Sequence, residues 1–400
     1  MQKLVKLPLV FLFIASLIGL VLRWHYFQPI VAFKYPFWLH AHSHLMFLGW
    51  VFNALSIGYV ICFLPESAQR RYKGIFYTLN LLVLGMLISF PLQGYGVYSI
   101  AISTLHTAVV VIYCLKFFKD TISTKSNISI WFARVSLSFF LISAIGPFVV
   151  GVLAAKGLGQ SDGYHLAVYY YLHFQYNGVF TFGVFALFFH LLTVRGIDFH
   201  LEHATRFGWL LFFSCFPAYA LSSLWTSPPL IANWIGLLAA GTQVIAFYYF
   251  LKSINRSWPA IGEMFTKPSR LLLIVSLVAF GAKLLLQLLS VHPSIAVLAY
   301  EIRFYVIAYL HLVLIGMISL FLIVWYKEWN LLPLKRLYIY LLLIGFISSE
   351  LVMISIGWWP GFFNIPKWMV ITSVIMAIGI TGIIYDFLFT PNTKVLSNEI

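Results

Sequence analysis

The feature that most constrains the fold of this chain is a series of twelve long apolar stretches with short polar segments between them. A bilayer core about 30 Å thick is crossed by roughly 20 apolar residues in α-helical form. Helices also satisfy every backbone hydrogen bond within the lipid. We therefore predict an all-α, polytopic membrane protein with twelve transmembrane helices, over residues 7–24, 42–64, 74–94, 97–118, 129–154, 166–193, 207–226, 230–251, 270–290, 300–326, 337–357 and 368–389.

The composition excludes most classes of water-soluble protein. Of the 400 residues, 62% are hydrophobic and only 9% are Asp, Glu, Lys or Arg, whereas ordinary globular domains carry about a quarter charged residues. A soluble enzyme, a disordered regulator and a nucleic-acid-binding protein are therefore set aside. The cysteines Cys62, Cys114 and Cys215 lie in apolar runs at unrelated spacings, so neither a disulfide framework nor a CxxC metal site is expected.

The distribution of positive charge predicts the orientation of the chain. Of the 25 Lys and Arg residues, 18 fall on one side of the predicted membrane, three lie in or at the ends of spans, and four fall on the other side: Arg23, Lys34, Lys156 and Lys367. Because positively charged loops stay in the cytoplasm, both termini are predicted to be cytoplasmic. The net charge of +14 is then explained by topology, and no nucleic-acid partner is expected.

We see no linker, low-complexity segment or convincing internal repeat in the chain. The longest polar interval, residues 252–269, is interpreted as a cytoplasmic loop with turn signals. We therefore expect a single integral membrane domain over residues 1–400.

Six of the twelve histidines lie in the outer part or at the outer mouth of predicted helices, where coordinating groups are costly and call for a reason. They occupy the second, fourth, sixth and tenth helices, which all run inward if the N-terminus is cytoplasmic. Each lies near the outer start of its helix, so they are predicted to share one depth in the outer half of the bilayer. A shared layer is what a metal or heme site needs. These residues are His40, His42, His44, His106, His173 and His311.

The densest motif is HAHSHLMFLGW at the start of the second helix. His40 and His44 are one turn apart on one face of a helix, and His42 points away from them. His44 has glycine five residues later, and His311 repeats this spacing in HLVLIG. Two such histidines on different helices are the usual way to hold a low-spin heme b. We expect His44 and His311 to be its axial ligands, with His40 beside them; the alternative is a pair of histidines hydrogen-bonded to neighbouring helices.

Two further groups of residues are candidates near this layer. His173, Asn177 and Thr181 form a polar stripe at four-residue intervals, which fits a ligand to a second metal, a group that supports such a ligand, or a structural hydrogen-bonded stripe. His106 is a second candidate metal ligand. Arg303 lies eight residues, about 12 Å, before His311 on a similar face. This position suits a clamp on heme propionates, and a salt bridge to Glu301 or Glu350 is the alternative.

These residues resemble a known superfamily. Twelve spans, cytoplasmic termini and histidines on the second, sixth and tenth helices look like the catalytic subunit of heme-copper oxidases and nitric oxide reductases. HAHSHLMFLGW and HLVLIG are similar, more closely, to the histidine segments of the NnrS family of heme and copper membrane proteins linked to nitric oxide. The likeness covers nearly the whole chain in topology but only about thirty residues in motif. It implies a heme-copper-oxidase-like bundle in the bacterial inner membrane.

The sequence also departs from the oxidase pattern. Oxidases carry His-x-His on the tenth helix, whereas Tyr309 precedes His311 here, and the seventh helix lacks the paired histidines of the oxidase copper or non-heme iron site. The resemblance therefore implies heme b, with copper or non-heme iron as a second metal. It implies a role in nitric oxide response or respiratory redox metabolism, with nitric oxide or oxygen as a gas ligand and a membrane or periplasmic electron donor. A divergent oxidoreductase and a non-enzymatic carrier of small molecules or metals are the alternatives, and whether the chain is an enzyme is left open.

Overall fold

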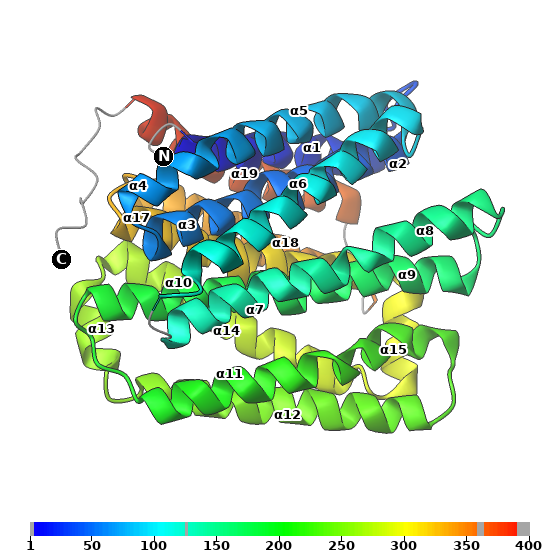
Figure 1. Cartoon of the computed structure of the whole chain (residues 1–400). Helices are drawn as coiled ribbons and strands as arrows, with labels where there is room; N and C mark the ends of the chain where they lie inside the picture. Colours follow the sequence, from blue (N-terminus) through cyan, green and yellow to red (C-terminus); the bar gives the residue numbers. More distant parts are fainter. Residues whose placement is uncertain (1–3, 125–126, 358–363, 390–400) are drawn as a thin grey trace. The chain divides into compact units, whose positions relative to one another are not determined.

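The computed structural model describes residues 4–124, 127–357 and 364–389, and within these ranges every regular element is a helix (Figure 1). Twelve helices or continuous helix runs are long and apolar enough to cross a membrane. The prediction of an all-α, polytopic membrane protein with twelve spans is therefore confirmed. Lys3, Lys125 and Lys394, which contribute to the predicted charge asymmetry, lie outside the described residues.

The helices follow one another in three blocks of four spans, and several spans consist of more than one element. The first block contains α1 (Leu7–Phe27), α2 (Tyr35–His44), η2 (Leu45–Phe52), α3 (Asn53–Phe63), α4 (Glu66–Gln69), η3 (Arg70–Tyr72), α5 (Lys73–Gln93) and α6 (Val97–Thr121). The second contains α7 (Ile128–Ser143), α8 (Ile145–Ala155), α9 (Asp162–His173), η4 (Phe174–Phe180), α10 (Thr181–Val194), α11 (Leu201–Cys215), η5 (Pro217–Thr226) and α12 (Ile231–Ile254). After α13 (Trp258–Met264), the third contains α14 (Lys267–Leu289), α15 (Pro293–Glu301), α16 (Arg303–His311), η6 (Leu312–Ser319), α17 (Leu320–Glu328), α18 (Arg336–Ser355) and α19 (Ile365–Phe389).

The second span begins earlier than the sequence predicted. The helix starts at Tyr35, seven residues before the predicted residue 42, and has a proline in its first turn, where proline is well tolerated. The aromatic and histidine-rich segment YPFWLHAHSH has a low mean hydropathy, which hid this part of the span. As a result, His44 is the tenth residue of its span and lies inside the helix rather than at its mouth.

The second span of each block is the most enclosed. In the second, sixth and tenth spans, 89%, 83% and 61% of the residues in the most apolar window are buried, against 28–56% in the other nine. Each of these three spans contains one π-helix, η2, η4 or η6. The same interrupted span therefore recurs once in each block, a repeat of secondary structure that is not visible in the sequence.

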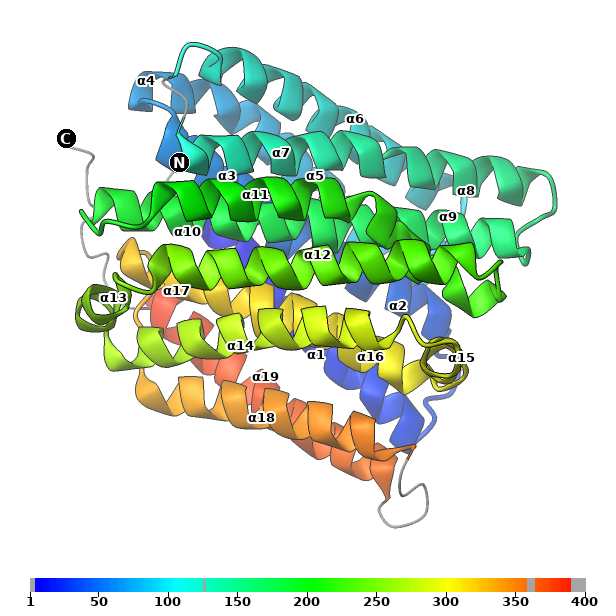
Figure 2. The same cartoon turned by 90° about the horizontal axis from the view of Figure 1, so that it is seen from below.

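The described residues divide into two compact units, and each is considered by itself. Of the described residues, unit 1 comprises 4–124, 267–269, 322–357 and 364–389, and unit 2 comprises 127–266 and 270–321. In unit 1, α1 and α18 both pack along α19, and α5 packs along α6 and α2. In unit 2, α11 lies beside α12, as Figure 2 shows, and α7 lies beside α10.

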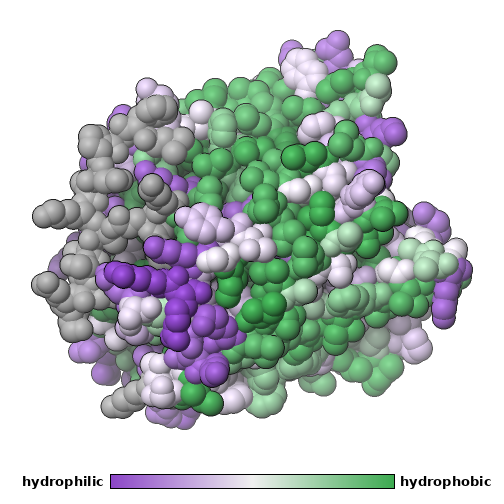
Figure 3. Space-filling model, turned by 45° about the horizontal axis from the view of Figure 1, so that its top comes forward, coloured by the Kyte–Doolittle hydropathy of each residue, from purple (hydrophilic) through white to green (hydrophobic). Residues whose placement is uncertain are grey.

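Many large apolar side chains point outward from the protein instead of packing between helices. Leu81, Ile88, Leu238 and Val278 are each more than 60% exposed. Figure 3 shows hydrophobic side chains spread over much of one face, with hydrophilic ones gathered toward its margins. Large continuous apolar surfaces of this kind mark contact with lipid or other proteins, as expected of membrane-spanning helices.

Candidate functional site

Each of the three π-helices begins immediately after one of the predicted ligand histidines. His44 precedes η2, His173 precedes η4 and His311 precedes η6. π-Helical turns are rare in proteins, and those that do occur frequently lie at functional sites. Their recurrence at these three histidines marks the positions as equivalent, and the sequence contained no signal for this irregularity.

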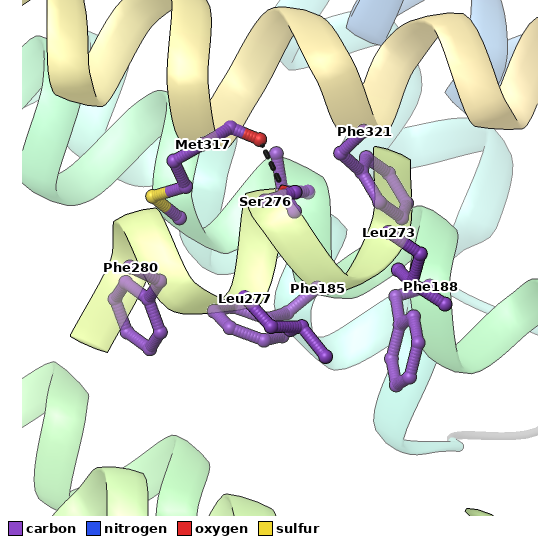
Figure 4. Close-up of a pocket in the computed structure, with 9 residues that line it drawn as sticks. Phe185, Phe188, Leu273, Ser276, Leu277, Phe280, Met317 and Phe321 are labelled. Atoms are coloured by element: carbon purple, nitrogen blue, oxygen red, sulfur yellow. Dashed lines mark hydrogen bonds between the residues drawn. The ribbon is translucent and has the colours of Figure 1, made fainter. Parts of the chain in front are cut away.

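Two of these π-helices are fixed by the same kind of hydrogen bond from the preceding span. In the second block, Ser136 on α7 donates to the carbonyl oxygen of Val179 at 2.7 Å. In the third block, Ser276 on α14 donates to the carbonyl oxygen of Met317 at 2.6 Å, next to a small apolar cavity (Figure 4). Both acceptors lie six residues after the block's histidine. The second and third blocks therefore share this hydrogen bond in addition to the same order of helices.

A glycine five residues after each histidine is the third shared feature, and two of these glycines lie in tight contact with an aromatic ring. A Cβ on Gly49 would lie 3.1 Å from the ring of Phe11 on α1, and one on Gly178 would lie 2.5 Å from the ring of Phe139 on α7. The space beside Gly49 is therefore filled by an aromatic side chain of the preceding span. Gly316 completes the set of three at the level of sequence.

His44 has the orientation expected of a metal ligand. Its Nδ1 lies 2.9 Å from the carbonyl oxygen of His40, one turn earlier. An Nδ1–H donated to a backbone carbonyl leaves the lone pair on Nε2, and ligating histidines are usually held in this way. The half-buried imidazole packs at 4.3 Å from the ring of Phe90, and the ring of His40 lies 4.4 Å from that of Tyr95.

His106, on α6 in the same unit, has an unsatisfied ring nitrogen. Its side chain is 1% exposed, and its Nδ1 has no hydrogen-bond partner among the described residues. His106 also lies close enough to His44 to interact with it electrostatically. Because a buried polar atom without a partner is costly, Nδ1 of His106 is a point where unit 1 would accept a bound group.

His42 lies on a different face of its helix from His40 and His44. Its Nδ1 lies 2.9 Å from the carbonyl oxygen of Ala15 on α1. Its ring packs against Gly19 on the same helix, where a Cβ would lie 3.0 Å from Cε1 of His42. The prediction that His42 points away from the other two histidines is confirmed. The contacts of His42 join α2 to α1.

Both ring nitrogens of His173 are hydrogen-bonded within unit 2. Its Nε2 lies 2.8 Å from the carbonyl oxygen of Cys215, and its Nδ1 lies 3.1 Å from Nδ2 of Asn177. With Nε2 as donor and Nδ1 as acceptor, the neutral ring is fully satisfied. Of the interpretations that the sequence left open, this arrangement matches a structural hydrogen-bonded stripe, and neither nitrogen faces a vacant coordination position.

His311 and Arg303 lie at the two ends of α16 in unit 2. His311 is half-buried at the junction with η6, and Arg303 is exposed at the start of the helix. Arg303 lies within electrostatic range of Tyr169 on α9. His44 thus belongs to unit 1, and His173 and His311 belong to unit 2.

The sequence interpretation placed Arg23 in an outer loop, and this is wrong. Arg23 lies in the last two turns of α1 and is 7% exposed. Its guanidinium donates to the hydroxyl oxygens of Ser349 at 2.6 Å and Ser373 at 3.0 Å. An arginine near a helix end is usually interfacial, so only the distant partners on α18 and α19 reveal its burial.

Among the residues that the structure describes, no group of three or more His, Cys, Asp and Glu side chains is arranged to hold a metal ion. No protein-family model matches the chain, and no curated protein matches it significantly.

Proposed function

We propose that this chain is a heme b-binding integral membrane protein of the bacterial cytoplasmic membrane, acting in nitric oxide response or respiratory redox metabolism. The observation that carries the proposal is the orientation of His44. Its Nδ1 is committed to the backbone of its own helix, so Nε2 is the nitrogen available to iron. The occurrence of a π-helix after His44, His173 and His311 supports a special role for these positions.

The residues have distinct roles in this proposal. His44 and His311 would hold the heme iron, Arg303 would bind the propionates, and His40 would orient His44 through its carbonyl group. A bound heme would supply one-electron redox chemistry and, where a coordination position opens, binding of a gas such as nitric oxide or oxygen. Electrons would come from a membrane or periplasmic donor. The unsatisfied nitrogen of His106 supports a second metal, copper or non-heme iron, in unit 1 rather than at His173.

The test is the heme content of four purified proteins: wild type, His44→Ala, His311→Ala and His42→Ala. We expect a low-spin b-type spectrum in wild type and His42→Ala, and loss of that spectrum or of the heme in the other two. Either of these two substitutions would remove a residue that holds the heme, whereas His42 contacts α1. Reduced-minus-oxidised spectra and heme extraction give the readout, and size-exclusion profiles show whether each variant is folded.

A wild-type protein without heme when expressed with ample heme, or normal spectra in both axial variants, would contradict the proposal. Oxygen consumption separates it from the divergent oxidase. We expect no cyanide-sensitive oxygen reduction at oxidase-like rates by the pure chain, because residues 207–226 of its seventh span contain no histidine. The structure starts this span earlier than predicted, at Leu201, and the stacked pair His200 and His203 lies at its very beginning, with His200 exposed.

A further inference from the structure

Unit 2 contains a lysine inside a membrane span that no acidic residue neutralises. Lys283 lies on α14 and is 1% exposed. It makes no ion pair or hydrogen bond with any described residue, and its ammonium lies 5.6 Å from the centre of the Phe280 ring. The acidic residues of this unit are all exposed at or near helix ends: Asp162, Asp198, Glu202, Glu263 and Glu301.

Two buried glutamines of unit 2 lie near the level of this lysine. Gln287 is one turn further along α14 and is 7% exposed, and Gln243 on α12 is 1% exposed. The Oε1 atoms of both glutamines have no hydrogen-bond partner among the described residues. Buried amide groups without partners are uncommon in native structures, so their position beside a buried amine calls for an explanation.

Side-chain contacts between α12 and α14 bring these groups to one level. The ring of Phe247 lies 5.4 Å from that of Phe280, and Asn233 donates to the carbonyl oxygen of Val291 at 2.8 Å. These two contacts fix the antiparallel register of the helices. Gln243 is one turn before Phe247, on the same face, and the register places it at the level of Lys283 along the helix axes.

The other polar groups near Lys283 are uncharged or are already hydrogen-bonded to each other. Cys215 and His173 both lie within electrostatic range of Lys283. His173 donates its Nε2 proton to the carbonyl oxygen of Cys215, so the imidazole does not accept from the amine. The cluster therefore has one cationic group, two amides and a thiol, with no anion of its own.

We propose that Lys283, Gln243 and Gln287 form a binding site for a small monovalent inorganic anion, such as chloride. An ammonium ion buried without a counter-charge is strongly disfavoured, and a bound anion would supply that charge. The orientation of a glutamine amide is an assignment, and either amide turned over presents an NH₂ donor toward the anion. Gln287 lies two residues before the end of α14, so the proposed site is close to one end of the span. The site does not involve heme and is independent of the function proposed above.

The experiment measures thermal unfolding of the purified full-length protein in detergent. Chloride replaces gluconate at constant ionic strength, and the midpoint is followed against chloride concentration. We expect a saturable rise for the wild type, because a ligand that binds only the folded state stabilises it. Lys283→Met should lose the rise. Lys252→Met, which removes an exposed lysine from α12, is the matched control and should retain it.

Gln243→Leu keeps the ammonium and removes one amide, so the chloride concentration at half-saturation should increase by about tenfold or more, as for loss of a hydrogen bond to a charged group. This variant also decides the question if Lys283→Met does not fold. The proposal is overturned by the absence of a chloride effect on the wild type, by the same effect in Lys283→Met, or by unchanged half-saturation in Gln243→Leu.

Discussion

At the scale of single residues, similar histidines in the three blocks have acquired different surroundings. His44 donates to a carbonyl group of its own helix and keeps Nε2 available. In contrast, both ring nitrogens of His173 are hydrogen-bonded, to Asn177 and to the carbonyl group of Cys215. The position four residues after the histidine explains part of this difference. It is Asn177 in the second block and the apolar residues Leu48 and Ile315 in the other two, which cannot donate to an imidazole.

This difference predicts the effect of substitutions at His173. His173→Ala should lower the free energy of unfolding by about 1–2 kcal/mol, since it leaves Asn177 and the Cys215 carbonyl group without their partner. Asn177→Leu removes only one of the two bonds and should cost less. Heme content should stay at the wild-type level in both variants. Denaturation in detergent, with metal and heme analysis of the same samples, provides the measurement; loss of a metal from His173→Ala without loss of stability would instead identify a ligand.

At the scale of helices, close packing of α18 on α19 depends on glycines. A Cβ on Gly379 would lie 2.5 Å from the backbone nitrogen of Leu342 and 2.8 Å from the carbonyl oxygen of Tyr338. Backbone atoms cannot move aside as a flexible side chain can. Small residues at such positions let membrane helices approach each other closely.

We therefore expect Gly379→Ala to destabilise the protein by about 1–3 kcal/mol, as overpacking does. The matched control is Gly241→Ala on α12, where a Cβ would meet no atom within 4 Å. This control should be neutral or more stable by up to about 1 kcal/mol, because alanine favours the helix. Thermal midpoints of the two variants in the same detergent make the comparison, and equal midpoints would show that the α18–α19 contact tolerates a wider spacing.

The sequence predicted the elements better than their irregularities. Twelve spans were predictable because apolar length is a local property, and the divergent face of His42 followed from helical periodicity. The early start at Tyr35 was missed because polar and aromatic residues lower the hydropathy there. The π-helices leave no local signal, and the partners of Arg23 and His173 lie far away in the chain. The shared pattern of the blocks consists of few residues, so it becomes visible only when the π-helices align them.

At the scale of the whole molecule, the blocks have the same number of spans, and this has a consequence for orientation. Four spans return the chain to the side from which it started, so the second span of every block crosses the membrane in the same direction. His44, His173 and His311 are the tenth, twelfth and ninth residues of their spans. They should therefore lie at similar depths, which is the arrangement that the heme proposal requires of His44 and His311.

Orientation can be measured with reporter fusions, because the positive charges predict which side each loop occupies. Reporters placed after residue 394 and between residues 122 and 127 should be active only as cytoplasmic fusions. A reporter between residues 157 and 161, which connect α8 to α9, should be active only as an external fusion. Paired reporters that function on opposite sides of the membrane give a positive signal for either result. A C-terminus on the outer side would mean that an odd number of spans crosses the membrane. The three histidines would then no longer share a direction and a depth, and a heme ligated by both His44 and His311 would lose its geometric basis.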